Sequence, residues 1–336
     1  MKFTGLVLSL ACLASTAFAH ENGTVKIYDA KLNPEIFVLI KPGRLVLVDG
    51  EKQTLLVPKD AQAASDNLIK VRNFFFDKFS RKSWDNKSSD IVASVNVNKL
   101  MSPLDITGQR QNAAWTKTKF LFGAGSKKGL SGMVNAIDVV GHEYTHAVIQ
   151  TSSNLAYEGQ SGALNEHLAD VFGAILNVHY NNPANPYLIG SSVLHGEYAE
   201  KAGALRDMMD PSKGLQPQPA HMDDLNLPKF VKYGPGCVPT AQNDKCGVHV
   251  LSGIPNRMAA LVMSAIGPEN AAPLFYNVMT KRLSEKSNFS DYRQALLEEC
   301  KSMSSDTCGI VEDALNSVGI PAFTLNQDLK PLTSHN

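Results

Sequence analysis

The feature that most constrains this chain is the segment His142-Glu143-Tyr144-Thr145-His146, set in an apolar run from Met133 to Ile149. Residues four apart lie on one face of a helix, so the two imidazoles would point at the same place. This H-E-x-x-H pattern is typical of zinc sites in which the Glu acts as general base. The alternative is a chance grouping of polar residues on a buried helix, and the rest of the chain must separate the two.

Composition limits what else the chain can be. It has 336 residues, of which 43% are hydrophobic and 19% charged, as in an ordinary globular protein with one large or two medium domains. Lys+Arg and Asp+Glu are both 32, so the formal net charge is zero. Such a balance provides no general attraction to nucleic acid or to an acidic membrane, and we expect neither as a partner.

Residues 1–19 have the pattern of a signal peptide. Lys2 supplies the positive charge, an apolar run from Leu6 to Leu13 follows, and Ala17-Phe18-Ala19 is a small-x-small cleavage site. The run is too short to span a bilayer, and no later stretch is long enough, so we expect no stable membrane association. Lipid attachment at Cys12 is disfavoured, because the residue three before it is not aliphatic. We expect a secreted, extracellular or periplasmic protein.

Four of the five Cys remain once the signal peptide is removed: Cys237, Cys246, Cys300 and Cys308. In an oxidising compartment an even number of Cys favours disulfides, and four allow three pairings. Closeness in sequence favours Cys237 with Cys246 and Cys300 with Cys308. Zinc binding is the alternative, but no C-x-x-C spacing occurs.

The chain changes character along its length. From Thr24 to Leu56, short apolar runs separated by turn residues predict a β-meander, with one strand over Ile36 to Ile40. A helix is predicted from Asp60 to Phe79 and a strand from Ile91 to Val97. Helical periodicity then dominates, in segments 134–151, 162–180, 254–266, 271–283, 290–303 and 308–318. We therefore predict an α+β protein with a β-rich lobe over 20–150 that ends in the motif helix, and a mainly helical lobe over 151–336.

A catalytic zinc site needs a third protein ligand besides two His. Glu166 is the strongest candidate, in the segment Asn165-Glu166-His167-Leu168-Ala169-Asp170. Asp170 lies one turn further on and could accept the second ring N–H of His142, as carboxylates near metal-bound His usually do. The alternative is a solvated acidic face, but the surrounding Ala, Leu, Val and Phe favour burial.

Four motifs together resemble the thermolysin family of secreted zinc metalloendopeptidases. They are the H-E-x-x-H segment, the Asn165 to Asp170 segment, Arg206-Asp207-Met208-Met209-Asp210-Pro211 and Gly247-Val248-His249, in the family's order. The resemblance covers most of the chain after the signal peptide and is sharpest from Asn112 to His249. It implies a two-lobed fold with the motif helix at the floor of a cleft, and peptides or proteins as substrates. We expect the protein to be a monomer.

The resemblance also implies roles for particular residues. One catalytic zinc ion would be held by His142, His146 and Glu166, with Asp170 and Asn165 behind them. Glu143 would take a proton from the attacking water that zinc activates. His249 and Tyr157 would stabilise the oxyanion, with Asp244 orienting His249. Apart from the resemblance, Cys246 lies inside that loop, so we expect a Cys237–Cys246 bridge to stiffen it.

The same match assigns the substrate contacts. Asn112 and Ala113 would bind the substrate backbone along an edge strand, and Arg206 would bond the carbonyl after the scissile bond, although a surface salt bridge is the alternative for that residue. An apolar pocket would be formed by Leu130, Met133, Val139 and Leu205. We therefore expect cleavage on the amino side of bulky hydrophobic residues.

Two departures from the family pattern stand out. The family's double calcium site should be lost, because Asp138 remains but Asn177, Asn185, Tyr187 and Gly190 stand where carboxylates are expected. A separate weak calcium site is conceivable at Asp49, Glu51 and Gln53, although an acidic turn explains them equally. Sequence resembling the mature domain, Val25 to Lys31, directly follows the signal peptide, which leaves no room for a long propeptide.

Two other functions compete with the endopeptidase. One is a catalytically silent binding protein on the same fold, but Glu143, His249 and the three ligands are all intact. The other is a zinc aminopeptidase, for which no residue that would anchor a free amine is evident.

Overall fold

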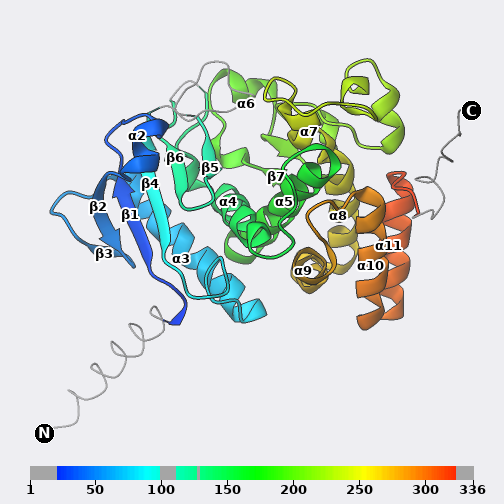
Figure 1. Cartoon of the computed structure of the whole chain (residues 1–336), viewed down its shortest axis with the longest axis horizontal. Coiled ribbons are helices and arrows are strands. Elements are labelled where there is room, and N and C mark those ends of the chain that lie inside the picture. Colours follow the sequence, from blue (N-terminus) through cyan, green and yellow to red (C-terminus); the bar gives the residue numbers. More distant parts are fainter. Residues whose placement is uncertain (1–20, 99–110, 127–128, 323–336) are drawn as a thin grey trace, which may run out of the picture.

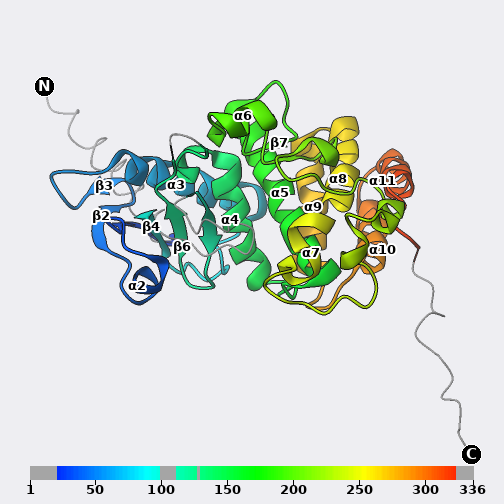
Figure 2. The ribbon, with the colours of Figure 1, turned by 90° about the horizontal axis from the view of Figure 1, so that it is seen from above.

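The computed structural model describes residues 21–98, 111–126 and 129–322, so the predicted signal peptide lies outside the described residues. A sheet with its helices forms one side of the molecule and a group of helices forms the other, with α4 (Ile137–Gln150) and α5 (Gly159–Asn181) between them (Figures 1 and 2). The predicted α+β architecture is confirmed.

Within the described residues, the sheet has six strands in the order β3-β2-β1-β4-β6-β5. They are β1 (Val25–Asp29), β2 (Arg44–Val48), β3 (Glu51–Lys52), β4 (Ile91–Val97), β5 (Ala113–Trp115) and β6 (Phe120–Gly123). Strand β1 pairs antiparallel with β2 but parallel with β4, and β4 pairs parallel with β6. Parallel neighbours need a long crossover, which α3 (Lys59–Phe79) provides between β1 and β4. Strand β5 pairs antiparallel with β6 at the edge.

The β-meander prediction was wrong in one segment, although β1, β2 and β3 pair antiparallel in chain order as a meander does. Residues predicted as a strand over Ile36 to Ile40 form the helix α2 (Glu35–Ile40), of which only Val38 is buried. A short apolar run does not distinguish strand from helix by periodicity. Pro34 precedes the helix, and its fixed φ and missing N–H suit a helix start better than a strand interior.

Helix α3 confirms its sequence prediction. Its apolar stripe, which includes Ala64, Leu68, Val71 and Phe75, is fully buried. The helix ends at Ser80, which adopts a left-handed conformation with φ of 53°. Burial of this stripe joins the sheet to the central helices, because Phe75 packs against both Tyr144 of α4 and Phe172 of α5.

The helical side is built around α5, which is buried from Ser161 to Leu176. Its remaining helices are α6 (Glu197–Lys201), α7 (Asp244–Leu251), α8 (Gly253–Ile266), α9 (Pro268–Asn277), α10 (Phe289–Glu299) and α11 (Ser305–Ser317). A two-stranded ribbon of β7 (Leu188–Ile189) and β8 (Arg206–Asp207) lies in the connection before α7. The shorter turns are η1 (Met133–Asn135), η2 (Ser191–Val193), η3 (Pro211–Lys213), η4 (Met222–Asn226), η5 (Val231–Tyr233), η6 (Val278–Arg282) and η7 (Cys300–Ser302).

Two glycines let α4 and α5 approach closely. A Cβ on Gly173 of α5 would lie 2.6 Å from the backbone oxygen of Asp138 in α4. A Cβ on Gly141 of α4 would lie 2.3 Å from Cδ1 of Leu176 in α5. This close packing lets side chains from both helices reach one point.

Two disulfides join Cys237 to Cys246 and Cys300 to Cys308, the local pairing favoured from the sequence. Within the described ranges, none of the helices has the length and apolar character needed to cross a membrane.

Candidate active site

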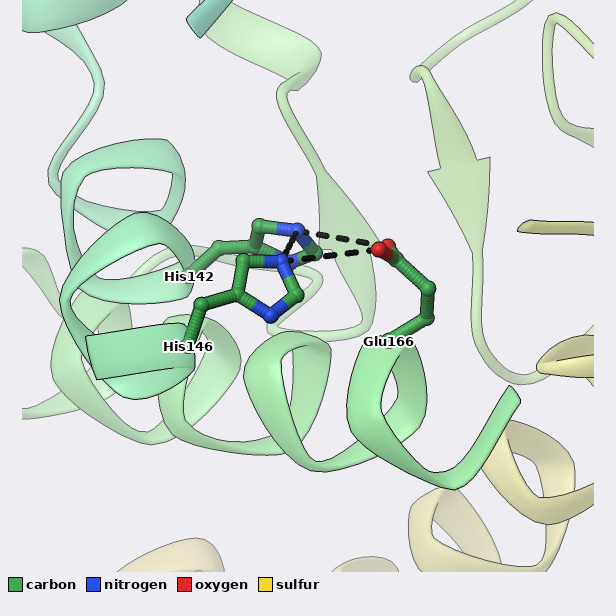
Figure 3. Close-up of side chains that lie close together, drawn as sticks. All are labelled: His142, His146 and Glu166. Carbon is green, nitrogen blue, oxygen red and sulfur yellow. Dashed lines mark hydrogen bonds and ion pairs between the residues drawn. The ribbon is translucent and has the colours of Figure 1, made fainter. Parts of the chain in front are cut away.

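Side chains of His142 and His146 from α4 and Glu166 from α5 converge on one point (Figure 3). The two Nε2 atoms are 3.0 Å apart, His142 Nε2 lies 3.4 Å from Glu166 Oε2, and His146 Nε2 lies 3.5 Å from Glu166 Oε1. A tetrahedral zinc ion with bonds of about 2.0–2.1 Å would hold its donor atoms roughly 3.3 Å apart. The triangle therefore has the dimensions of a zinc site.

The outer ring nitrogens of both histidines have partners that fix the tautomer. His142 Nδ1 lies 2.9 Å from Asp170 Oδ1, and His146 Nδ1 lies 2.7 Å from Asn165 Oδ1. Asn165 donates its amide to the carbonyl of Leu155, so its oxygen faces His146. Both rings thus donate from Nδ1, so Nε2 is the nitrogen of each ring that would bind a metal.

Glu166 shows why a cation suits this position. The residue is 1% exposed, and its Oε2 is buried without a hydrogen-bond partner. An isolated buried carboxylate oxygen is costly, and a metal ion would supply the missing charge and contact. The other oxygen, Oε1, accepts a hydrogen bond from the Tyr157 hydroxyl. The buried oxygen and the N,N,O donor set fit zinc.

Charges around the triangle perturb the ligands. Burial lowers the pKa of His142, but the hydrogen bond to Asp170 and the negative charges of Asp170 and Glu166 outweigh it and raise the pKa to about 10. Burial raises the pKa of Glu166, but the charges of His249 and His146 hold it well below its usual range. The pKa of Asp170 is likewise depressed, since Arg206 and His142 overcome the effect of burial. The carboxylates stay charged and make the site attractive to a cation.

Glu143 lies beside the triangle on α4 and borders the cleft. Its Oε2 accepts a hydrogen bond of 2.8 Å from the backbone N–H of Trp115 in β5. The edge strand therefore orients this carboxylate. Sequence reasoning did not find the contact, because a main-chain donor leaves no signal in the residue type.

His249 lies on α7 and also borders the cleft. Asp244 accepts from its ring Nδ1 at 2.7 Å and from its backbone N–H at 2.9 Å. The Nε2 atom lies 3.1 Å from the Tyr157 hydroxyl, so the two predicted oxyanion donors are neighbours. Residues Asp244 to Gly247 all have positive φ, between 51° and 73°, which folds the backbone back so that Asp244 reaches His249 twice.

Arg206 forms a two-pronged ion pair with the fully buried Asp170. Its Nε lies 2.7 Å from Oδ2 and its Nη2 lies 2.6 Å from Oδ1, while Nη2 also approaches His142 Nδ1 at 3.4 Å. This is not the surface salt bridge considered as an alternative. Arg206 also borders the cleft, so its predicted contact with substrate stays a prediction.

A cleft of about 950 Å³ connects these groups. Its walls contain the three candidate ligands with Asn165, Glu143, His249, Tyr157 and Arg206, and all six other residues predicted to contact substrate, which are Asn112, Ala113, Leu130, Met133, Val139 and Leu205. Asp170 and Asp244 are buried behind the His residues that they contact.

The region expected to have lost calcium is held by hydrogen bonds within the chain. Asp138 is 3% exposed, its Oδ2 accepts from the backbone N–H of Gly190 at 2.7 Å, and its Oδ1 accepts from Val139 at 2.9 Å. Loss of the double calcium site remains a prediction that these bonds favour. At the second proposed position, Asp49 Oδ1 is shared by Arg72 and the backbone of Val25, so calcium there also remains a prediction.

Comparison with known proteins agrees with this geometry. Residues 14–150 match the family model described as thermolysin metallopeptidase, catalytic domain, and residues 153–320 match thermolysin metallopeptidase, alpha-helical domain. The chain belongs to the thermolysin family of metallopeptidases. It is a zinc metalloendopeptidase.

Individual relatives are similar over most of the chain. Neutral protease NprE from Bacillus pumilus is 34% identical over 280 residues, which cover 83% of each protein. Bacillolysin from Bacillus subtilis (strain 168) is also 34% identical over 83% of this chain, which spans 48% of that relative's length. The solved precursor of protealysin, a metalloproteinase from Serratia proteamaculans, is 28% identical, with a TM-score of 0.73 over 89% of this chain and 88% of the other.

Proposed function

We propose that the protein cuts internal peptide bonds on the amino side of bulky hydrophobic residues. The observation that carries the proposal is that Leu130, Met133, Val139 and Leu205 border the same cleft as the metal-ligand triangle and Glu143. An apolar pocket beside the reacting groups stabilises an apolar side chain next to the bond that is cut. Small or charged side chains gain less from the same pocket.

An extended substrate would bind along β5. Among the described residues, this strand is the last in the sheet and pairs with β6 on one side, so the side facing the cleft is suited to adding a substrate strand. Asn112 and the backbone of Ala113 are the proposed contacts. Arg206 would donate to the carbonyl that follows the scissile bond, with its orientation held by Asp170.

Glu143 is the proposed general base. Zinc, when bound by the three ligands, would lower the pKa of water and polarise the substrate carbonyl. Glu143 would remove a proton from the attacking water and later deliver it to the leaving amine. The hydrogen bond from Trp115 holds one carboxylate oxygen, which leaves the other for proton transfer.

His249 and Tyr157 are the proposed oxyanion donors. Burial lowers the pKa of His249, but Glu166 and Asp244 outweigh it and raise the pKa, which favours the protonated ring. A protonated Nε2 would present one donor where negative charge develops, and the neighbouring Tyr157 hydroxyl would present a second once it turns from Glu166 Oε1. Asp244 fixes the ring through Nδ1.

We further propose that residues 1–19 direct export and are removed, that residues 20–150 and 151–336 form the two lobes, and that the mature protein acts on peptides or proteins as a monomer outside the cytoplasm.

A peptide-library profile of the purified protein tests the specificity. Cleavage products should be enriched in Leu, Phe and similar residues immediately after the cut, and a chelator should abolish cleavage of casein or of a peptide blocked at its N-terminus. Stepwise loss of N-terminal residues would indicate an aminopeptidase, and no cleavage at all would indicate a binding protein. A profile without apolar enrichment at that position would contradict the proposed pocket.

The variant Glu143→Ala tests the base. Loss of the carboxylate should lower kcat by about 10²–10⁴-fold, the usual contribution of a positioned acid or base. Zinc content should be unchanged, because Glu143 is not among the three converging ligands. Retained turnover would exclude Glu143 as the base.

A further inference from the structure

The carboxylate behind His142 has a third partner that comes from the far helices. Besides His142 and Arg206, Asp170 accepts a hydrogen bond of 2.8 Å from Nδ2 of Asn256 to its Oδ2. Asn256 lies on α8 and is fully buried. It therefore acts on Asp170 from the core and not from the cleft.

This contact continues into a buried chain of polar groups. The Oδ1 atom of Asn256 lies 2.8 Å from Nδ1 of His167 on α5, and Nε2 of His167 lies 2.7 Å from the hydroxyl of Tyr292 on α10. His167 and Tyr292 are fully buried. Three helices thus contribute one continuous path of hydrogen bonds from the helical core to the zinc site.

The ionised Asp170, at one end of the path, determines the direction of every hydrogen bond in it. An ionised Asp170 can only accept, so Asn256 must turn its NH₂ toward Asp170 and its oxygen toward His167. His167 must then carry its proton on Nδ1, and in the neutral ring Nε2 accepts from the Tyr292 hydroxyl. Every donor points toward the carboxylate, and reversing the Asn256 amide would set its oxygen against that charge.

We propose that Asn256 and His167 are positioning residues for the zinc site, which hold Asp170 in the orientation that fixes the His142 ring. Arg206 contacts both carboxylate oxygens of Asp170, so Asn256 adds a second hold on Oδ2. Arg206 reaches it from the wall of the cleft, whereas Asn256 holds Oδ2 from a rigid buried helix. Oδ1 is thereby kept against His142 Nδ1, and Nε2 faces Glu166.

A purely structural reading is that these polar groups only join α5, α8 and α10. The two interpretations predict different effects of these residues on zinc binding once Asp170 is removed. A structural tie would act whether or not the carboxylate is present, whereas a positioning path would lose its effect once Asp170 is removed.

Zinc affinity, measured by competition with a chromophoric chelator, separates the readings. Removing an outer partner of a metal-bound His typically weakens affinity about 10–100-fold, and we expect this for Asn256→Ala. In the background of Asp170→Ala, the further change Asn256→Ala should shift the dissociation constant by no more than about twofold, the margin within which independent effects add. Equal effects in both backgrounds, or an effect within that margin in the unaltered background, would overturn the proposal.

Tyr292→Phe provides a milder test that removes one oxygen at the far end and leaves the packing nearly intact. It should weaken zinc binding, but by less than about tenfold, because the remaining path is unbroken. Tyr144→Phe is the matched control, since Tyr144 is fully buried on α4, between His142 and His146, and lies outside the path. Equal zinc affinities in these two variants would also overturn the proposal.

The inference rests on zinc binding at the triangle, and its failure can be told apart from failure of the proposed function. An unaltered protein that binds zinc and cleaves casein, with affinity untouched by Asn256→Ala, refutes only the positioning path. An unaltered protein that binds no zinc refutes both.

Discussion

His142 lies between two carboxylates that act on different atoms of its ring. Asp170 contacts Nδ1 at 2.9 Å, and Glu166 lies 3.4 Å from Nε2, the atom that would face zinc. Burial alone would keep the ring neutral, but the two anions raise the pKa to about 10. The metal-free ring is therefore protonated at neutral pH, and a metal ion must displace that proton.

Zinc binding should consequently release about one proton per site at pH 7 to 9, and the apparent affinity should rise about tenfold per pH unit below the pKa of His142. Calorimetry in buffers of different ionisation enthalpy measures the released proton. Because the folded pKa lies above the model value of 6.5, this interaction stabilises the metal-free protein fully below pH 6.5, and the stabilisation is lost as pH rises toward 10. A binding enthalpy independent of the buffer would contradict the assignment, and Asp170→Asn should reduce the proton release.

At the scale of elements, the start of α7 is an unusual piece of backbone. Asp244, Lys245, Cys246 and Gly247 are left-handed in succession, and a left-handed helix costs L-residues roughly 1–2 kcal/mol each. Asn243 helps to offset this cost by accepting from the backbone N–H of Cys246 at 3.0 Å, and the bond to Cys237 ties the same residue. The turn places Asp244 behind His249.

Replacing Cys237 and Cys246 together by Ser should therefore affect both stability and catalysis. Closing a loop between residues 9 apart contributes about 3 kcal/mol in the chain-entropy account, and loss of the tie should also lower kcat by loosening His249. Cys300→Ser with Cys308→Ser is the matched control, since that pair is 8 apart and lies at η7 and α11, away from the turn that contains Asp244. For the first pair, both the free energy of unfolding measured in urea and kcat should fall. For the second pair, only the free energy of unfolding should fall. Full activity and stability after removal of the first bridge would refute its role.

At the scale of the whole molecule, what could be predicted from sequence depended on distance along the chain. His142 and His146 are four apart on a helix, so their common direction followed from periodicity. The apolar run at Ile36 to Ile40 was misassigned because local pattern alone does not separate helix from strand. The hydrogen-bonded pairs in the path through Asn256 are separated by 86, 89 and 125 positions in the sequence. Only the packing of α5, α8 and α10 brings these residues together. An isolated Asn or His in an apolar helix carries no signal of such a partner.

The arrangement of the two sides also bears on calcium. Asp138 on α4 accepts a hydrogen bond from the backbone N–H of Gly190, which lies next to β7. This hydrogen bond joins two segments that a bound cation would otherwise link. After EDTA treatment, zinc alone should therefore restore the full Tm, and added calcium should produce no further concentration-dependent rise. Asp138→Ala should cost about 1–3 kcal/mol whether or not calcium is present, because it leaves a buried N–H without a partner. A Tm that climbs with calcium would show that a calcium site persists.

The close crossing of α4 and α5 has one more consequence. The spacing between the two His and Glu166 depends on the distance between their helices, and that distance is permitted by hydrogen atoms at Gly141 and Gly173. A methyl group at Gly173 would meet rigid backbone at 2.6 Å, whereas one at Gly141 would meet the end of a leucine side chain, which can turn away. The distance between the metal ligands therefore depends on Gly173, although its own side chain is only a hydrogen atom. Gly173→Ala would push α4 and α5 apart and separate the two His from Glu166.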